Sequence, residues 1–237
     1  MGLGMADTRS RGLLYLETAR PFPSACVRWQ SQRFSPDVAT VDLSFQGIVG
    51  ADELESRLRR HYFGAPSLVL EGNPLASSLY CLRNFECLLL LNLRRCSITD
   101  EDTALLSTLR QLVHVDVSMN LLTSAGAQQL LCITTLQSLN VEGNVVGDDC
   151  VSQLLDHASL THLNVGGTQL TSSGMACLLR SPRLTVVYAE DLVMDERGCS
   201  ALENSRSIWC ICLRSARLAT SNFTFLTYLF KTCLMAI

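Results

Sequence analysis

Apolar residues recur in one short pattern along most of the chain. The stretch 136–146 reads LQSLNVEGNVV, and related stretches lie 24 residues before it, LVHVDVSMNLL, and 24 residues after it, LTHLNVGGTQL. Each stretch alternates apolar and polar residues, as a half-buried β-strand does, and then reaches an asparagine or a threonine. The pattern predicts a series of repeats, each of which begins with a short strand.

A single register describes all of these repeats. With Asn144 as position 0, apolar residues fall at positions −8, −5, −3 and +2. Steps of 24 residues give further zeros, and two units near the N-terminus fit with lengths of 27 and 23. The zeros of units 1 to 8 are Gln46, Asn73, Cys96, Asn120, Asn144, Thr168, Leu192 and Ala216. All four positions are apolar in every unit, whereas only 48% of the chain is hydrophobic.

The second half of the units indicates a helix. Threonine, serine or aspartate recurs at positions +3 and +4, as at Thr99, Thr123 and Thr171. These residue types cap helix N-termini. A leucine pair follows at +10 and +11 in several units, which is helical spacing after a cap. A unit of strand, turn and helix is too small to bury its own apolar face, so neighbouring units are expected to share one core.

The repeats resemble the leucine-rich repeat family, whose motif is L-x-x-L-x-L-x-x-N-x-L, over about residues 38–237. The segments TSAGAQQLL and TSSGMACLL look most like the GALA-type and ribonuclease-inhibitor-like subclasses, and unit 3 is similar to the cysteine-containing repeats of F-box proteins. The resemblance implies an α/β fold, a curved solenoid of about eight repeats with parallel strands on its concave face and short helices on its convex face. We expect a repeat domain at 37–237 and a partly disordered N-terminal extension or cap at 1–36.

The residues at position 0 have a structural explanation. The chain must turn sharply after each strand, which leaves backbone N–H and C=O groups inside that need partners. An asparagine side chain carries both a donor and an acceptor, so a stack of them can link adjacent turns. The predicted ladder consists of Asn73, Cys96, Asn120, Asn144 and Thr168, with the cysteine and the threonine as smaller substitutes.

Positions −6, −4 and −2 alternate with the core positions and are therefore expected to point onto the concave face. Units 4 to 7 place a polar, mildly acidic patch there. Extended concave surfaces are what solenoids use for binding, and Tyr188 is the predicted anchor, since tyrosine is enriched among hot spots. The alternative is that the patch only meets water. The predicted partner-binding residues are His114, Asp116, Asn140, Glu142, His162, Asn164, Tyr188 and Glu190.

Catalytic and metal-binding arrangements find little support. His114 and His162 lie two repeats apart, which is about 10 Å in a parallel sheet, too far to share one zinc ion. Cys210 and Cys212 have no further ligand pair beside them. The chain lacks a phosphate-binding loop, an H-E-x-x-H helix and a G-x-S-x-G turn. We therefore predict that the protein is not an enzyme and holds no metal or cofactor.

Composition narrows the location and the partners. A net charge of −3 argues against a nucleic-acid binder, and no run of 18 apolar residues predicts a membrane span. Eleven cysteines without C-x-x-C pairs, and the lack of an apolar leader, favour the reduced cytoplasm. The arginine-rich, acid-poor stretch 1–36 leaves a mitochondrial presequence as the alternative.

The expected function is that of a non-catalytic protein-interaction module or scaffold, with an unknown protein partner on the concave face. Two alternatives remain open: a substrate-recognition adaptor of a ubiquitin ligase, and a GTPase regulator similar to the Ran GTPase-activating protein. The apolar C-terminal stretch 223–237 leaves three alternatives: a partner or a second copy covers it, the N-terminal arm folds onto it as a cap, or the chain is truncated.

Overall fold

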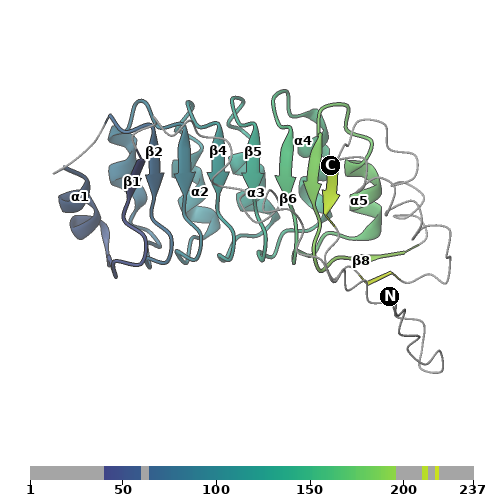
Figure 1. Ribbon diagram of the computed structural model, residues 1–237, viewed down its shortest axis with the longest axis horizontal. Helices are drawn as coiled ribbons and strands as arrows, with labels where there is room; N and C mark the ends of the chain where they lie inside the picture. Colours follow the sequence, from purple (N-terminus) through teal and green to yellow (C-terminus); the bar gives the residue numbers. More distant parts are fainter. Residues whose placement is uncertain (1–39, 60–63, 196–209, 213–216, 219–237) are drawn as a thin grey trace, which may run out of the picture.

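The computed structural model describes residues 40–59, 64–195, 210–212 and 217–218. Its main element is one parallel sheet in which eight strands follow in chain order, as Figure 1 shows. The strands are β1 (Thr40–Asp42), β2 (Ser67–Val69), β3 (Leu90–Asn92), β4 (His114–Asp116), β5 (Ser138–Asn140), β6 (His162–Asn164), β7 (Val186–Tyr188) and β9 (Cys210–Cys212). Each covers positions −6 to −4 of its unit and pairs with equivalent positions of the next, so the predicted register and solenoid are confirmed.

Short helices follow the strands. They are α1 (Ala51–Arg59), the 3-10 helix η1 (Leu79–Asn84), α2 (Asp100–Leu106), α3 (Ser124–Leu130), the 3-10 helix η2 (Asp148–Cys150) with α4 (Val151–Asp156), and α5 (Ser172–Leu178). Helices α2, α3 and α4 lie behind the row of strands in Figure 1, so these described helices cover one face of the sheet. Strands β8 (Val193–Met194) and β10 (Arg217–Leu218) form a separate parallel pair.

Threonine at +3 caps two of the helices. Thr123 accepts a hydrogen bond from the N–H of Ala125, and Thr171 accepts from Ser173 and Gly174, so both cap the helices that follow. Unit 2 has Ala76 at +3, and its helix η1 is a 3-10 helix whose N-cap makes no side-chain hydrogen bond. The expectation of a helix in this unit is met only by that tighter form.

The core lies between the sheet and the helices. The residues at positions −5 and −3, such as Val115 and Val117, are fully buried through the middle of the sheet. At the first strand the equivalent residues Val41 and Leu43 are only partly buried, because β1 has a neighbour on one side only. None of the described helices is long and apolar enough to cross a membrane.

Asparagines at position 0 join neighbouring turns. The amide nitrogen of Asn144 donates to the carbonyl oxygens of Val141 (3.0 Å) in its own unit and Val117 (2.9 Å) in the preceding one. Its Oδ1 accepts from the N–H of Leu122 at 3.1 Å. Asn73 and Asn120 make equivalent sets of hydrogen bonds to the units before them. Each side chain therefore satisfies backbone groups of two units at once.

The smaller residues at position 0 differ from one another. Cys96 Sγ lies 3.2 Å from the carbonyl oxygen of Leu70 in the preceding unit, so it still reaches across. The hydroxyl of Thr168 donates to Val165 at 2.7 Å and accepts from the N–H of Leu170, and both partners belong to its own unit. A threonine side chain is too short to bridge two turns here.

A second series of hydrogen bonds joins the units on the helix side. The carboxylate of Asp100 accepts from the N–H and hydroxyl of Thr123, and Asp148 accepts in the same way from Thr171. Between these joints, the hydroxyls of Ser124 and Ser172 accept from the N–H groups of the following units. Carboxylate and hydroxyl joints thus alternate from unit 3 to unit 7.

Glycine at +6 makes room for the carboxylate joints. A Cβ at Gly126 would stand 2.3 Å from Oδ1 of Asp100, and a Cβ at Gly174 would overlap Oδ1 of Asp148. Both glycines are therefore required by close approach of the neighbouring unit. The expectations for residues 1–36 and for the apolar stretch 223–237 lie outside the described residues.

Candidate functional site on the open face of the sheet

The eight predicted partner-binding residues lie in four adjacent strands, β4 to β7, or two residues after a strand ends. Positions −6, −4 and −2 of units 4 to 7 lie on the face of the sheet opposite the helices, which we call the open face. The register places Asp116 opposite Asn140, Asn140 opposite Asn164, and Asn164 opposite Tyr188. The structure therefore places these residues side by side, as the repeat register predicted.

The residues at position −4 are much less accessible than alternation predicts. Asp116, Asn140 and Asn164 are only 5%, 3% and 9% exposed. Each accepts a hydrogen bond through its side chain from the backbone N–H two residues later, at 2.9 to 3.0 Å. Asp42 and Asn92 make the same bond in units 1 and 3. These aspartates and asparagines terminate the strands by completing the backbone, which is the geometry of an Asx turn.

The same side chains also bond sideways from unit to unit. Asn140 Nδ2 donates to Asp116 Oδ2 at 3.1 Å, and Asn164 Nδ2 donates to Glu142 Oε2 at 3.0 Å. Asn92 departs from this pattern, since the residue at −4 of unit 2 is Val69. Its Nδ2 is buried without a hydrogen-bond partner.

Asp116 is the buried carboxyl of this network. Removal of its side chain from water raises its pKa above the ordinary value. Hydrogen bonds from the hydroxyl and N–H of Ser118 oppose that rise, as do the positive charge of Arg94 and the amide of Asn140. The carboxyl is therefore held by donors on both sides, and its position is fixed by the fold.

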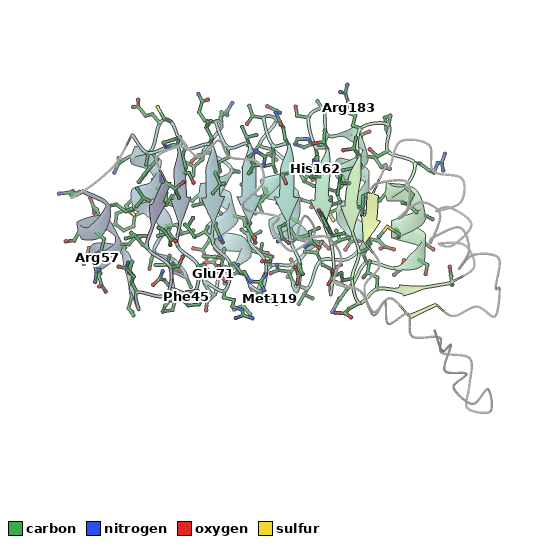
Figure 2. The ribbon with its side chains drawn as sticks, viewed as in Figure 1. Phe45, Arg57, Glu71, Met119, His162 and Arg183 are labelled. Carbon is green, nitrogen blue, oxygen red and sulfur yellow. The ribbon has the colours of Figure 1, made fainter. Side chains whose placement is uncertain are left out.

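Arg94 contacts polar residues of units 2, 4 and 5 on the open face. Its guanidinium donates to the hydroxyl of Ser118 at 3.0 Å and lies 3.5 Å from Oε1 of Glu71. Oε2 of Glu142, two units further along, is 4.0 Å away. Neither Arg94 nor Glu71 is among the residues predicted to bind a partner, although both occupy position −2 and Figure 2 labels Glu71 near the same edge of the strands as Phe45 and Met119.

The remaining predicted residues are the accessible ones. His114, Glu142, His162, Tyr188 and Glu190 are all half-buried. They occupy rows −6 and −2 on either side of the buried row, with Tyr188 at the end of that row. The ring of His162, labelled in Figure 2, lies with Nδ1 2.8 Å from the hydroxyl of Thr161. Their part in partner binding stays a prediction.

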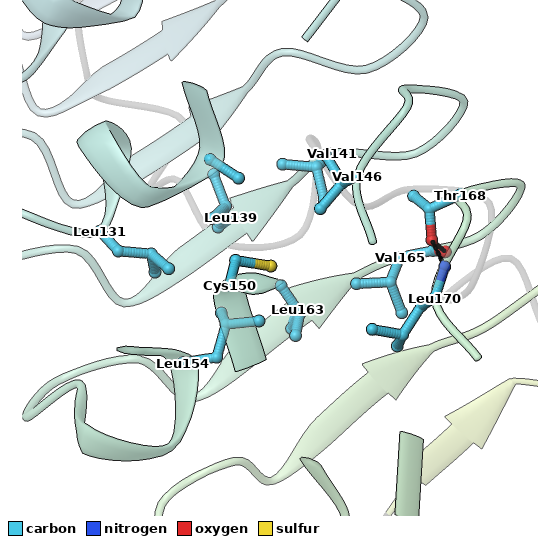
Figure 3. A pocket seen from close by; sticks show the side chains of 11 residues that line it. Leu131, Leu139, Val141, Val146, Cys150, Leu154, Leu163, Val165, Thr168 and Leu170 are labelled. Atoms are coloured by element: carbon cyan, nitrogen blue, oxygen red, sulfur yellow. Dashed lines mark hydrogen bonds between the residues drawn. The ribbon is translucent and has the colours of Figure 1, made fainter. Parts of the chain in front are cut away.

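The described residues provide no cluster for a metal ion. Strand β5 lies between His114 and His162, and no group of three or more His, Cys, Asp or Glu residues in the described ranges could hold one. A cavity of about 10 Å³ lies in the core between units 5 and 6, and Figure 3 shows its lining. That is the volume of one water molecule at most, and the lining is apolar apart from residues such as Thr168, so it does not form a ligand site.

The family model described as "Leucine Rich repeat" matches residues 132–154 and 156–179. These segments contain the strands and turns of units 5 and 6, around Asn144 and Thr168. These two segments make up about a fifth of the chain, and together with the strand and helix order above the match supports the fold. The fold is that of a leucine-rich repeat protein. The match is to the leucine-rich repeat in general, so the predicted subclasses stay predictions.

Two solved structures of internalins from Listeria monocytogenes are similar to this chain. Internalin C2 has 26% sequence identity and a TM-score of 0.50, over 63% of this chain and 61% of that one. Internalin InlF has 16% identity and a TM-score of 0.49, over 78% of this chain and 63% of that one. The alignments thus span less than two thirds of either solved chain. No curated protein sequence matches at a significant level.

Within this leucine-rich repeat fold, the backbone role of the residues at position −4 was not predicted, although the sequence carries a signal for it. Aspartate or asparagine stands at position −4 in five of the eight units, whereas asparagine stands at position 0 in three. Aspartate or asparagine that recurs at the end of most strands indicates an Asx turn. Reading the row only for its outward direction overlooked that backbone role.

Proposed function

We propose that this leucine-rich repeat solenoid is a non-catalytic interaction module that binds a partner protein through the open face of its sheet. The observation that supports the proposal is a contrast between neighbouring residues of this face, of which Asp116, Asn140, Asn164, Ser118 and Ser138 are buried and five others are only half-buried. The buried row at −4 is fixed by hydrogen bonds, and His114, Glu142, His162, Tyr188 and Glu190 stand half-exposed around it. A surface whose support is already ordered loses little conformational entropy when it binds.

Tyr188 is the proposed anchor. Its register partner in β6 is the buried Asn164, so the tyrosine ends the polar row and supplies the large amphipathic side chain of the face. Tyrosines of this kind dominate many protein interfaces. Glu142 and Glu190 give the surrounding surface an acidic character that suits a partner with basic or hydrogen-bonding side chains.

A reducing, cytoplasmic location is part of the proposal. Six cysteines of the described ranges are free thiols, of which Cys87, Cys132 and Cys177 are exposed. Burial raises the pKa of Cys81, Cys96 and Cys150 to about 11. Such buried thiols remain protonated and behave as small apolar side chains.

The test is affinity purification of partners on wild-type protein and on the variants Tyr188→Ala and Glu190→Ala, with quantitative mass spectrometry. The control is Gln153→Ala, an exposed residue of α4 on the helix side. We expect a specific partner to be lost at least tenfold on Tyr188→Ala and to be retained on the control, since loss of a hot spot costs about 2 kcal/mol or more.

Retention of every specific partner by both open-face variants would show that the binding surface lies elsewhere. The identity of the partner separates the alternatives. Recovery of cullin-adaptor components would assign the chain to a ubiquitin ligase, and recovery of a GTPase would assign it to GTPase regulation.

A further inference from the structure

A row of left-handed residues runs along the edge of the sheet where the strands end. The residue at position −1 has a positive φ, between 55° and 74°, in all of units 1 to 7. These residues are Phe45, Gly72, Arg95, Met119, Gly143, Gly167 and Asp191. In units 1 to 6 the N–H of each donates to the carbonyl of the next unit, so they stand side by side at the strand spacing of about 4.8 Å.

Three of these positions carry side chains that the backbone does not favour. Glycine adopts positive φ without strain and occupies three of the seven places, and aspartate is tolerated there. Phe45, Arg95 and Met119 are bulky residues in the same conformation, with φ of 55°, 55° and 56°. Such strain is typical of functional positions, since the fold itself would accept glycine.

The bulky side chains create an apolar surface rather than filling the core. Phe45 is 65% exposed and its ring covers Gly72, while the sulfur of Met119 covers Gly143. Leu121 and Val145, which follow the buried Asn120 and Asn144, are 63% and 51% exposed. Figure 2 shows Phe45 and Met119 along one edge of the molecule. We name Phe45, Arg95, Met119, Leu121 and Val145 the rim strip.

The rim strip also contains an exposed positive charge. Arg94, its neighbour in sequence, is engaged with Glu71, Ser118 and Glu142 on the open face. Arg95 is exposed, and the ion pairs found among the described residues do not include it. An available guanidinium beside apolar side chains favours a carboxylate that it can bind in bidentate fashion.

We propose that the rim strip binds an extended segment of a partner protein in which a carboxylate stands between large apolar side chains. Phe45 and Met119 lie three strand steps apart, about 14 Å, which about four residues of extended chain would span. An apolar side chain would pack on Phe45, a carboxylate would meet Arg95, and further apolar side chains would cover Met119, Leu121 and Val145. The rim strip is separate from the open face, and this proposal does not depend on the function proposed for the open face.

The test uses random seven-residue peptides displayed on phage and selected on the full chain. Enriched peptides, made with a fluorescein label, are then titrated by fluorescence polarisation. We expect sequences with aspartate or glutamate flanked by large apolar residues, and a loss of affinity of at least tenfold on Met119→Gly and on Arg95→Gly. Glycine suits the left-handed backbone at both places, so these variants keep the fold.

Two controls isolate the surface. Ser77→Gly replaces another exposed residue of positive φ, but its backbone N–H bonds to Asp102 on the helix side. Tyr188→Ala changes the open face. Both variants should bind the selected peptides as wild type does, and loss of peptide binding by Tyr188→Ala would place the site on the open face instead.

Three results would overturn the proposal: no enrichment, enrichment of peptides without acidic residues, or equal binding by Met119→Gly and wild type. Sedimentation of the wild-type chain tests the other occupant of such a surface. A dimer that Met119→Gly converts to a monomer would mean that a second copy covers the strip, and would equally overturn it.

Discussion

The open face and the rim strip reverse the usual relation between polarity and exposure. On the open face, Asp116, Asn140 and Asn164 are polar and buried, because their side chains complete the backbone and one another. On the rim strip, Phe45 and Met119 are apolar and exposed, and glycine could replace them in the backbone conformation that they hold. The comparison separates side chains that build this molecule from side chains that are available to something else.

The difference also predicts which substitutions should reduce stability and which should reduce binding. Removal of a side chain that satisfies buried backbone groups leaves those groups unpaired. This holds even for a polar side chain, which would be expected on the surface. A side chain on the rim strip can be removed with little effect on stability and a large effect on binding. Three substitutions test this distinction, in order of expected size.

The largest effect is expected for Asn144→Ala at a turn. The alanine leaves the N–H of Leu122 and the carbonyl of Val141 without the partner they now have, whereas Val117 keeps its bond to Asn120. Each orphaned buried group costs about 1–3 kcal/mol, so the free energy of unfolding should fall by about 3 kcal/mol in urea titrations. The exposed Gln169 supplies the control, since Gln169→Ala should change it by less than about 0.5 kcal/mol. A loss below about 1 kcal/mol for Asn144→Ala would contradict the ladder.

A smaller, pH-dependent effect is expected at His157, another buried polar side chain that completes the backbone. Its Nδ1 accepts from the N–H groups of Ser159 and Leu160, and its Nε2 lies 3.1 Å from the carbonyl of Ile133. Burial lowers the pKa of His157 below the ordinary 6.5, so the folded state favours the neutral ring. The stability that this ring contributes is present above pH 6.5 and is lost as the pH falls through the folded-state pKa.

The variant His157→Ser isolates that contribution. Ser181 holds the same place in the next unit and accepts from the N–H groups of Arg183 and Leu184, so serine can fill this role. We expect a cost of about 1 kcal/mol at pH 7 and a smaller loss of thermal stability than wild type between pH 7 and 5. Parallel melting curves at the two pH values measure it, and identical pH dependence in both proteins would exclude His157 as the source.

The smallest effect on stability is expected for Met119→Gly. Relief of the left-handed conformation, about 1–2 kcal/mol for an L-residue, offsets the greater freedom of glycine in the unfolded chain and the lost contact with Gly143. The melting temperature should stay within about 4 °C of wild type. A much larger drop would show that Met119 stabilises the fold, and would remove the distinction between the two regions.

Much of this architecture could be read from the sequence. The period and the apolar positions gave the strand register, because each repeat buries the same side chains against its neighbours. Asparagine at position 0 indicated the turns. The helix of unit 2 was less predictable, since the cap that fixes an α-helix at Thr123 and Thr171 is missing there.

The accessibility of the candidate site could not be read in the same way. Whether Asn140 reaches solvent depends on Asp116 beside it and on its own bond to the N–H of Glu142, and neither follows from the alternation within one unit. The left-handed backbone of Arg95 and Met119 could not be predicted from the apolar pattern either. Only the glycines at equivalent positions of other units hint at it, and hydrophobic periodicity does not consider them.

The alternating joints on the helix side have a consequence for how such a chain can grow or shrink. Removal of unit 4 alone would set Asp100 against unit 5, which has Gly147 where unit 4 has Thr123 and Cys150 where it has Gly126. The Cβ of that cysteine would then fall where a side chain at Gly126 would stand 2.3 Å from the Asp100 carboxylate. Removal of units 4 and 5 together would instead present Thr171 and Gly174, which match. Between units 3 and 7, a deletion or duplication therefore preserves these joints only when it involves an even number of repeats.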